Sequence, residues 1–83
     1  MASRPRPIRT RRAAAQIGAQ LAATRERQQL GVDQLAERAS ISRGTLRRVE
    51  AGDPAVGLTT FLTVVKALGR LDALLDALNP DED

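Results

Sequence analysis

The chain has 83 residues and contains neither cysteine nor histidine. This excludes a disulfide, a metal site with thiolate or imidazole ligands, and the commonest general base of enzymes. Because the single phenylalanine is the only aromatic residue, the core must consist of Ala, Leu, Ile and Val, which suits packed helices. A domain of this size without cross-links often gains stability from a second subunit.

Charge is divided unevenly along the chain. Residues 1–48 contain 11 arginines and 3 acidic residues, a net charge of +8, whereas residues 49–83 contain 2 basic and 7 acidic residues, a net charge of −5. Arginine forms paired hydrogen bonds with phosphates and guanine edges, so the basic half can bind a polyanion. The same charge also serves solubility, which leaves both interpretations open.

The sequence has no membrane or export signal. No apolar run approaches the ~20 residues of a membrane span, and no apolar signal-peptide segment follows the basic N-terminus. We therefore expect a cytoplasmic protein.

Residues 1–10 are expected to form a flexible basic arm. Pro5 and Pro7 disfavour a helix, and the arginines of the arm repel one another. The arm either contacts a DNA groove, as short basic arms do, or is only disordered. The arginines concerned, with the two that follow the arm, are Arg4, Arg6, Arg9, Arg11 and Arg12.

Five helices are expected in a domain that spans residues 11–79. The first covers residues 11–30, which are rich in strong helix formers, although Gly18 is a weak point that could move its start to residue 17. Gly31 is expected to end it. The spacing of apolar residues and the Gly, Pro and Ser residues that begin or end helices predict the other four at residues 32–39, 43–51, 58–68 and 70–78. Residues 80–83 are expected to form an acidic tail.

Residues 32–49 have the features of two short helices that cross at a tight turn (VDQLAERASISRGTLRRV). Ala36 is small enough for close contact inside the first helix, and Ser42 can cap the second. The elbow and the inner faces are apolar: Leu35, Ile41, Leu46 and Val49. The outward face can reach phosphates or guanine edges, or else is only a solvated surface: Arg43, Gly44, Arg47 and Arg48.

Residues 35–52 (LAERASISRGTLRRVEAG) closely resemble the helix-turn-helix of the Xre/Cro-repressor family. The resemblance extends over about residues 17–69, and the segment GDPAVGLTTFLTVVKALG is most similar to HipB-type antitoxins and related autoregulators. It implies an all-α, five-helix domain of the lambda-repressor-like type that binds double-stranded DNA as a homodimer. It implies that Glu50 pairs with Arg25. It also implies that the recognition helix begins with the DNA-binding residues, which are Ser42, Arg43, Gly44, Thr45, Arg47 and Arg48.

Two places depart from the family pattern. Gly31 and Val32 stand where the family has a Ser or Thr cap followed by a glutamine that anchors a phosphate. That anchor is therefore in doubt. Ser40 replaces the usual glycine of the turn, and we expect it to adopt a left-handed conformation.

The predicted function is a sequence-specific transcriptional repressor that binds an inverted repeat as a homodimer, without metal or cofactor. Asp72 and Asp76 lack a His, Cys or metal partner, and no serine has a base to activate it, so we expect no enzyme activity. The alternative is an antitoxin or adaptor whose main role is to bind a partner protein such as a toxin. Either core packing or a dimer interface accounts for the leucines of the last helix, which are Leu71, Leu74, Leu75 and Leu78.

Overall fold

The computed structural model describes residues 8–82, and within this range it contains helices and no strand. In chain order the elements are α1 (Ile8–Arg27), α2 (Val32–Ala39), α3 (Arg43–Glu50), α4 (Leu58–Ala67), α5 (Leu71–Leu78) and the short 3₁₀ helix η1 (Pro80–Glu82). The predicted all-α fold with five helices is confirmed. Between residues 8 and 82 no helix has both the length and the apolar content of a membrane span.

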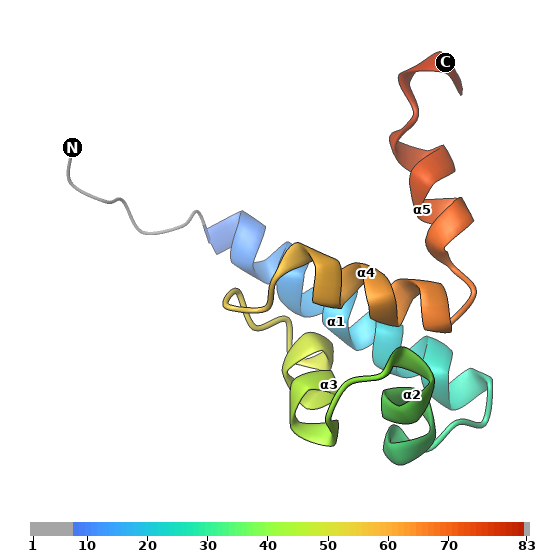
Figure 1. Cartoon of the computed structure of the whole chain (residues 1–83). Coiled ribbons are helices and arrows are strands. Elements are labelled where there is room, and N and C mark those ends of the chain that lie inside the picture. The colour runs from blue at the N-terminus through green and yellow to red at the C-terminus, as the bar shows by residue number, and fades with distance from the viewer. Residues whose placement is uncertain (1–7, 83) are drawn as a thin grey trace.

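The core lies where the first four helices meet, with α2 packed on α4 and α3 packed on α1 (Figure 1). Leu35, Leu46 and Val64 are fully buried and form its centre, one from each of α2, α3 and α4. Burial of such a side chain stabilises the fold by about 1.5–3 kcal/mol. The other core residues are also aliphatic: Leu21, Leu30, Ala36, Ala39, Val49, Val65 and Leu68.

The backbone of α1 touches the C-terminal end of α3. A β-carbon at Gly18 would lie 2.5 Å from the backbone oxygen of Glu50, and one at Gly52 would lie 2.5 Å from the backbone oxygen of Ala14. Gly18 therefore lies inside one continuous helix, and its expected role as a weak point near the start of that helix is wrong. The close approach of two backbones accounts for a glycine that helix propensity disfavours.

Both ends of α1 differ from the prediction. Residues 8–10 are helical, so the expected arm is too long by three residues. The reason is that a proline restricts the residue before it and leaves those after it free to form a helix. At the other end α1 stops at Arg27, and Gln29, with φ 59°, takes the left-handed conformation. Gly31 has an extended backbone at the start of α2 and does not end α1.

The C-terminal part leaves the four-helix body. In Figure 1, α5 extends away from the other helices. The described part of the expected acidic tail, residues 80–82, forms the 3₁₀ helix η1. Asn79 Oδ1 accepts a hydrogen bond from the backbone of Asp81 at 2.9 Å, which orders this turn.

We predict opposite effects for two glycine-to-alanine substitutions. Gly18→Ala is expected to destabilise the protein by about 1–3 kcal/mol, because the added methyl group overlaps the backbone of Glu50. Gly44→Ala is expected to stabilise it by about 0.5 kcal/mol, because a β-carbon there meets only Ser42 Oγ, at 3.9 Å. Urea unfolding followed by circular dichroism measures both. Equal effects of the same sign would contradict the backbone contact.

Candidate nucleic-acid interface

Residues 40–42 join α2 to α3 in a tight turn. Ser40 has φ 56° and ψ 42°, a left-handed conformation that an L-residue adopts at a cost. The turn is closed by a hydrogen bond from the Ile41 N–H to the backbone oxygen of Ala36 at 3.0 Å. Ser42 Oγ accepts a hydrogen bond from the Thr45 N–H at 3.0 Å and caps α3. The turn therefore fixes both the direction and the first turn of α3.

The start of α2 lacks a polar side chain at the position where the family pattern has its phosphate anchor. Val32 packs against the core, and Gly31 has no side chain. The Gly31 N–H donates instead to Gln34 Oε1 at 2.7 Å. Gln34 therefore closes this helix end by itself.

Arg25 of α1 and Glu50 of α3 form an ion pair that is largely shielded from solvent. Arg25 Nε lies 2.8 Å from Glu50 Oε2, and the two side chains are only 12% and 11% exposed. Arg25 also donates to the backbone oxygen of Leu30 at 2.9 Å. Its hydrogen bond with Glu50 raises the pKa of Arg25 above its ordinary value, so the guanidinium remains charged. One side chain thus links α1, the following loop and the end of α3.

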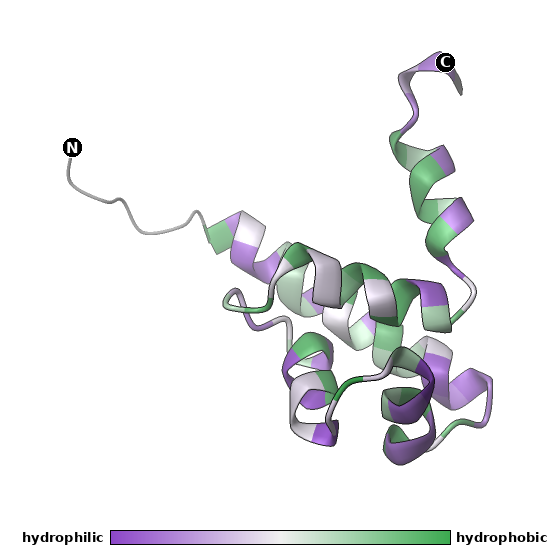
Figure 2. Cartoon of the chain, in the orientation of Figure 1, coloured by the Kyte–Doolittle hydropathy of each residue, from purple (hydrophilic) through white to green (hydrophobic). Residues whose placement is uncertain are grey.

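The outer face of α3 is strongly basic, and Arg43, Arg47 and Arg48 are all exposed there. Figure 2 shows hydrophilic residues along this helix and along the adjacent α2. Two of the arginines are oriented by carboxylates: Arg43 Nε lies 2.7 Å from Asp33 Oδ1, and Arg48 Nε lies 2.9 Å from Asp53 Oδ2. Such exposed pairs add little stability, but they set where each guanidinium points.

Asp53 follows α3 and accepts two hydrogen bonds. One comes from the Ala55 N–H at 2.8 Å and the other from Arg48 Nε. These bonds, led by the one from Ala55, hold the pKa of Asp53 below its ordinary value. The carboxylate therefore stays charged at neutral pH and keeps its hold on Arg48.

Residues 16–78 match the family model described as a helix-turn-helix domain, which covers more than half of the chain. The chain belongs to this family. In a helix-turn-helix domain the second helix of the motif is the one that enters the major groove, and here that helix is α3. No curated protein and no solved structure matches the chain.

Three of the five arginines assigned to or just after the N-terminal arm of this helix-turn-helix protein lie in α1. Arg9, Arg11 and Arg12 belong to the first turns of α1 and are exposed. Arg4 and Arg6 lie outside the described residues.

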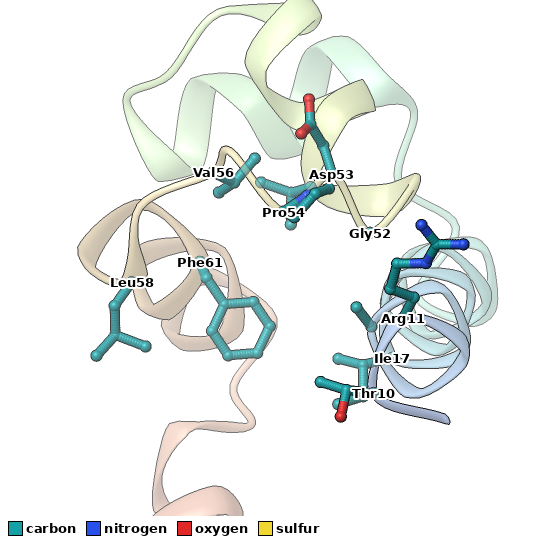
Figure 3. Close-up of a pocket in the computed structure, with 12 residues that line it drawn as sticks. Thr10, Arg11, Ile17, Gly52, Asp53, Pro54, Val56, Leu58 and Phe61 are labelled. Atoms are coloured by element: carbon teal, nitrogen blue, oxygen red, sulfur yellow. The ribbon is translucent and has the colours of Figure 1, made fainter. Parts of the chain in front are cut away.

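A groove between α1 and α4 was not predicted from the sequence. It has a volume of about 350 Å³ and lies between the N-terminal halves of the two helices, closed at one side by residues 52–56. Phe61 of α4 points across it toward Ile17 and Thr10 of α1 (Figure 3). The helical spacing places Ile17 on the inner face of α1, but it could not show that α4 leaves this side chain 43% exposed.

We predict that substitutions at the two serines of the turn change the stability of the protein in opposite directions. Ser40→Gly is expected to stabilise the protein by about 0.5–1 kcal/mol, because glycine adopts the left-handed conformation without steric cost. Ser42→Ala is expected to destabilise it by about 1 kcal/mol, because the cap of α3 is lost. Thermal unfolding of the two variants, two residues apart in one turn, measures the difference. A destabilised Ser40→Gly variant would argue against strain at Ser40.

Proposed function

We propose that this protein is a sequence-specific repressor of transcription that binds an inverted repeat in double-stranded DNA as a homodimer. The observation that carries the proposal is the exposed arginine face of α3, presented by a complete helix-turn-helix. An arginine in the first turn of a recognition helix can donate two hydrogen bonds to guanine O6 and N7. We assign this base contact to Arg43, and phosphate or base contact to Arg47.

Three neighbours of Arg43 complete the proposed interface. Ser42 and Thr45 lie at the exposed start of α3, and each hydroxyl can contact a phosphate. Gly44 has no side chain to separate the backbone of α3 from the duplex, which supports close approach. Arg48 points away from the first turn and is paired with Asp53, so we assign it to phosphate only. Further phosphate contacts by Arg4, Arg6, Arg9, Arg11 and Arg12 remain predictions.

The proposed dimer interface is the exposed side of α5. Leu71 and Leu74 pack partly against the core of their own chain. Leu75 and Leu78 are 56% and 72% exposed, so they are the leucines available to a second subunit. A two-fold dimer matches the symmetry of an inverted repeat, and to read two successive half-sites it must hold the two recognition helices about 34 Å apart, one turn of the duplex.

A second candidate function is that of an antitoxin or adaptor whose main role is to bind a partner protein, such as a toxin. The apolar groove between α1 and α4 favours it, because exposed apolar patches often mark interaction sites. The arginine face of α3 has no role in that function. Failure to bind any duplex at 50 mM salt would therefore favour this candidate over the repressor.

The salt dependence of binding tests the proposed DNA contact. If the dimer engages about six to eight phosphates, its affinity should fall by about a thousandfold or more between 50 and 200 mM salt, because bound counterions are released. Fluorescence anisotropy with a labelled duplex, selected from a random pool, measures this slope. A flat response to salt would contradict binding through the arginine face.

We further predict that Asp33 limits unspecific binding by Arg43. Asp33→Asn should raise the affinity for random duplex DNA by about threefold to tenfold, because it removes a carboxylate that repels phosphate and competes for Arg43. It should also weaken the preference at one base pair of each half-site, since the guanidinium loses its fixed direction. Arg43→Ala should abolish that preference, whereas Arg48→Ala should weaken binding to all sequences alike.

Glu37→Gln is the matched control, because it makes the same change of charge on the same helix, and Glu37 is exposed. A scan of single substitutions through the selected duplex measures base preference for each variant, with circular dichroism as the folding control. Equal behaviour of the Asp33 and Glu37 variants would show that only net charge matters. Unchanged preference in Arg43→Ala would remove Arg43 as the base-reading residue.

A further inference from the structure

The groove lies between the N-terminal halves of α1 and α4, and a side-chain hydrogen bond joins the chain just beyond their C-terminal ends. There, Gln28 Nε2 donates to the backbone oxygen of Leu68 at 2.9 Å. At the N-terminal ends the space of about 350 Å³ is lined mainly by apolar side chains, with Arg11 and the Arg48-paired Asp53 as its charged residues. Leu58, at the start of α4, is 71% exposed beside it (Figure 3). The groove therefore exposes apolar surface next to a positive charge.

The helix α5 has the complementary properties. None of its eight residues is buried in the described chain, and Leu75 and Leu78 are exposed on it. It carries Asp72 and Asp76 and no basic residue, and η1 adds further acidic residues directly after it. Figure 2 shows apolar and polar residues alternating along α5 as it leaves the body. The helix is thus apolar, acidic and without a partner of its own along its outer half.

We propose that this groove binds α5 of a second copy of the chain, and that the exchange is reciprocal. The inference deepens the proposed homodimer by naming the surface that receives Leu75 and Leu78. The charges of the two sides are compatible: Arg11 lines the groove, the first turn of α1 contains no acidic residue, and the one carboxylate in the lining, Asp53, is already paired with Arg48. The two sides also agree in length: an eight-residue helix is about 12 Å long, and the groove follows α1 for about two turns, from Thr10 to Ile17.

The α5 helix of the same chain is badly placed to fill the groove. It starts at the C-terminal end of α4, about 15 Å along the ten-residue helix from the end that lines the groove. To fold back, α5 would have to remove Leu71 and Leu74 from the core against which they pack. A second copy can present α5 without this loss. When two copies exchange α5 reciprocally about a two-fold axis, both grooves are filled and the assembly closes at two subunits.

Disulfide trapping tests the exchange directly, because the chain has no cysteine of its own. Ile17→Cys places a thiol in the groove and Leu78→Cys places one on α5. The two full-length variants, one of them carrying a mass tag, are mixed in a glutathione buffer and separated without reductant. We expect the mixed disulfide to exceed that formed by Leu78→Cys with Glu37→Cys, an exposed site on α2, by about tenfold or more.

Other cross-linking patterns would overturn the proposal in distinct ways. A dominant disulfide between two Leu78→Cys chains would show that α5 pairs with α5. In a chain that carries both Ile17→Cys and Leu78→Cys, a dominant internal disulfide in the monomer would show that α5 fills its own groove. Yields no higher than the control, in a protein that light scattering shows to be monomeric at tens of micromolar, would show that no copy binds there.

Reversal of charge provides a second measurement without cysteine. Arg11→Glu should weaken self-association about tenfold, since the contact occurs twice in the dimer, whereas Arg12→Glu should change it little. Adding Asp72→Arg and Asp76→Arg to Arg11→Glu should restore association. Equal effects of the Arg11 and Arg12 variants would overturn the assigned charge contact. DNA binding is measured separately on the unmodified chain, so that failure of the exchange and failure of the repressor function are told apart.

Discussion

The orientation of the whole interface depends on the place where α1 touches the end of α3. Gly18 and Gly52 allow the two backbones to approach, because a β-carbon at either would overlap the opposite chain. The ion pair between Arg25 and Glu50 holds the same end of α3 against α1, and both side chains are largely shielded from solvent. Since α3 is also joined to α2 by a turn of only three residues, this junction fixes the position of both helices relative to α1.

Much of this architecture could be predicted because it rests on local chemistry. The bounds of α2 and the cap at Ser42 follow from residues next to one another in the chain, and the left-handed backbone of Ser40 follows from the family resemblance, in which this position is usually a glycine. The errors concern long-range contacts or an overweighted proline. Gly18 was expected to weaken the helix because glycine has a low helix propensity. The contact that accounts for it involves the backbone of Glu50, which lies 32 residues away and leaves no local signal in the sequence. The start of α1 at Ile8 was missed because Pro7 was taken to disfavour the helix after it.

In the candidate nucleic-acid interface, too, the local features could be predicted from the sequence and the long-range contacts could not. An exposed arginine face on α3 follows from helical spacing, but the spacing does not reveal that Asp33 and Asp53 each hold one of its arginines. Those contacts depend on the angle between α2 and α3 and on the path of the chain after α3. The groove was missed for a related reason: an apolar residue such as Ile17 indicates a buried face only when another element covers it. Here α4 leaves that face open at one end.

The separation of charge between α3 and α5 has a consequence for the approach to DNA. The basic face and the acidic helix lie on different parts of the molecule, because α5 leaves the body (Figure 1). The subunit therefore has an electric dipole, and the field of a duplex exerts a torque that turns α3 toward it. At physiological salt this field extends only about 8 Å, so the rotation takes place in the last nanometre of diffusion. The dipole thus raises the fraction of collisions that are productive, an effect on the rate of encounter.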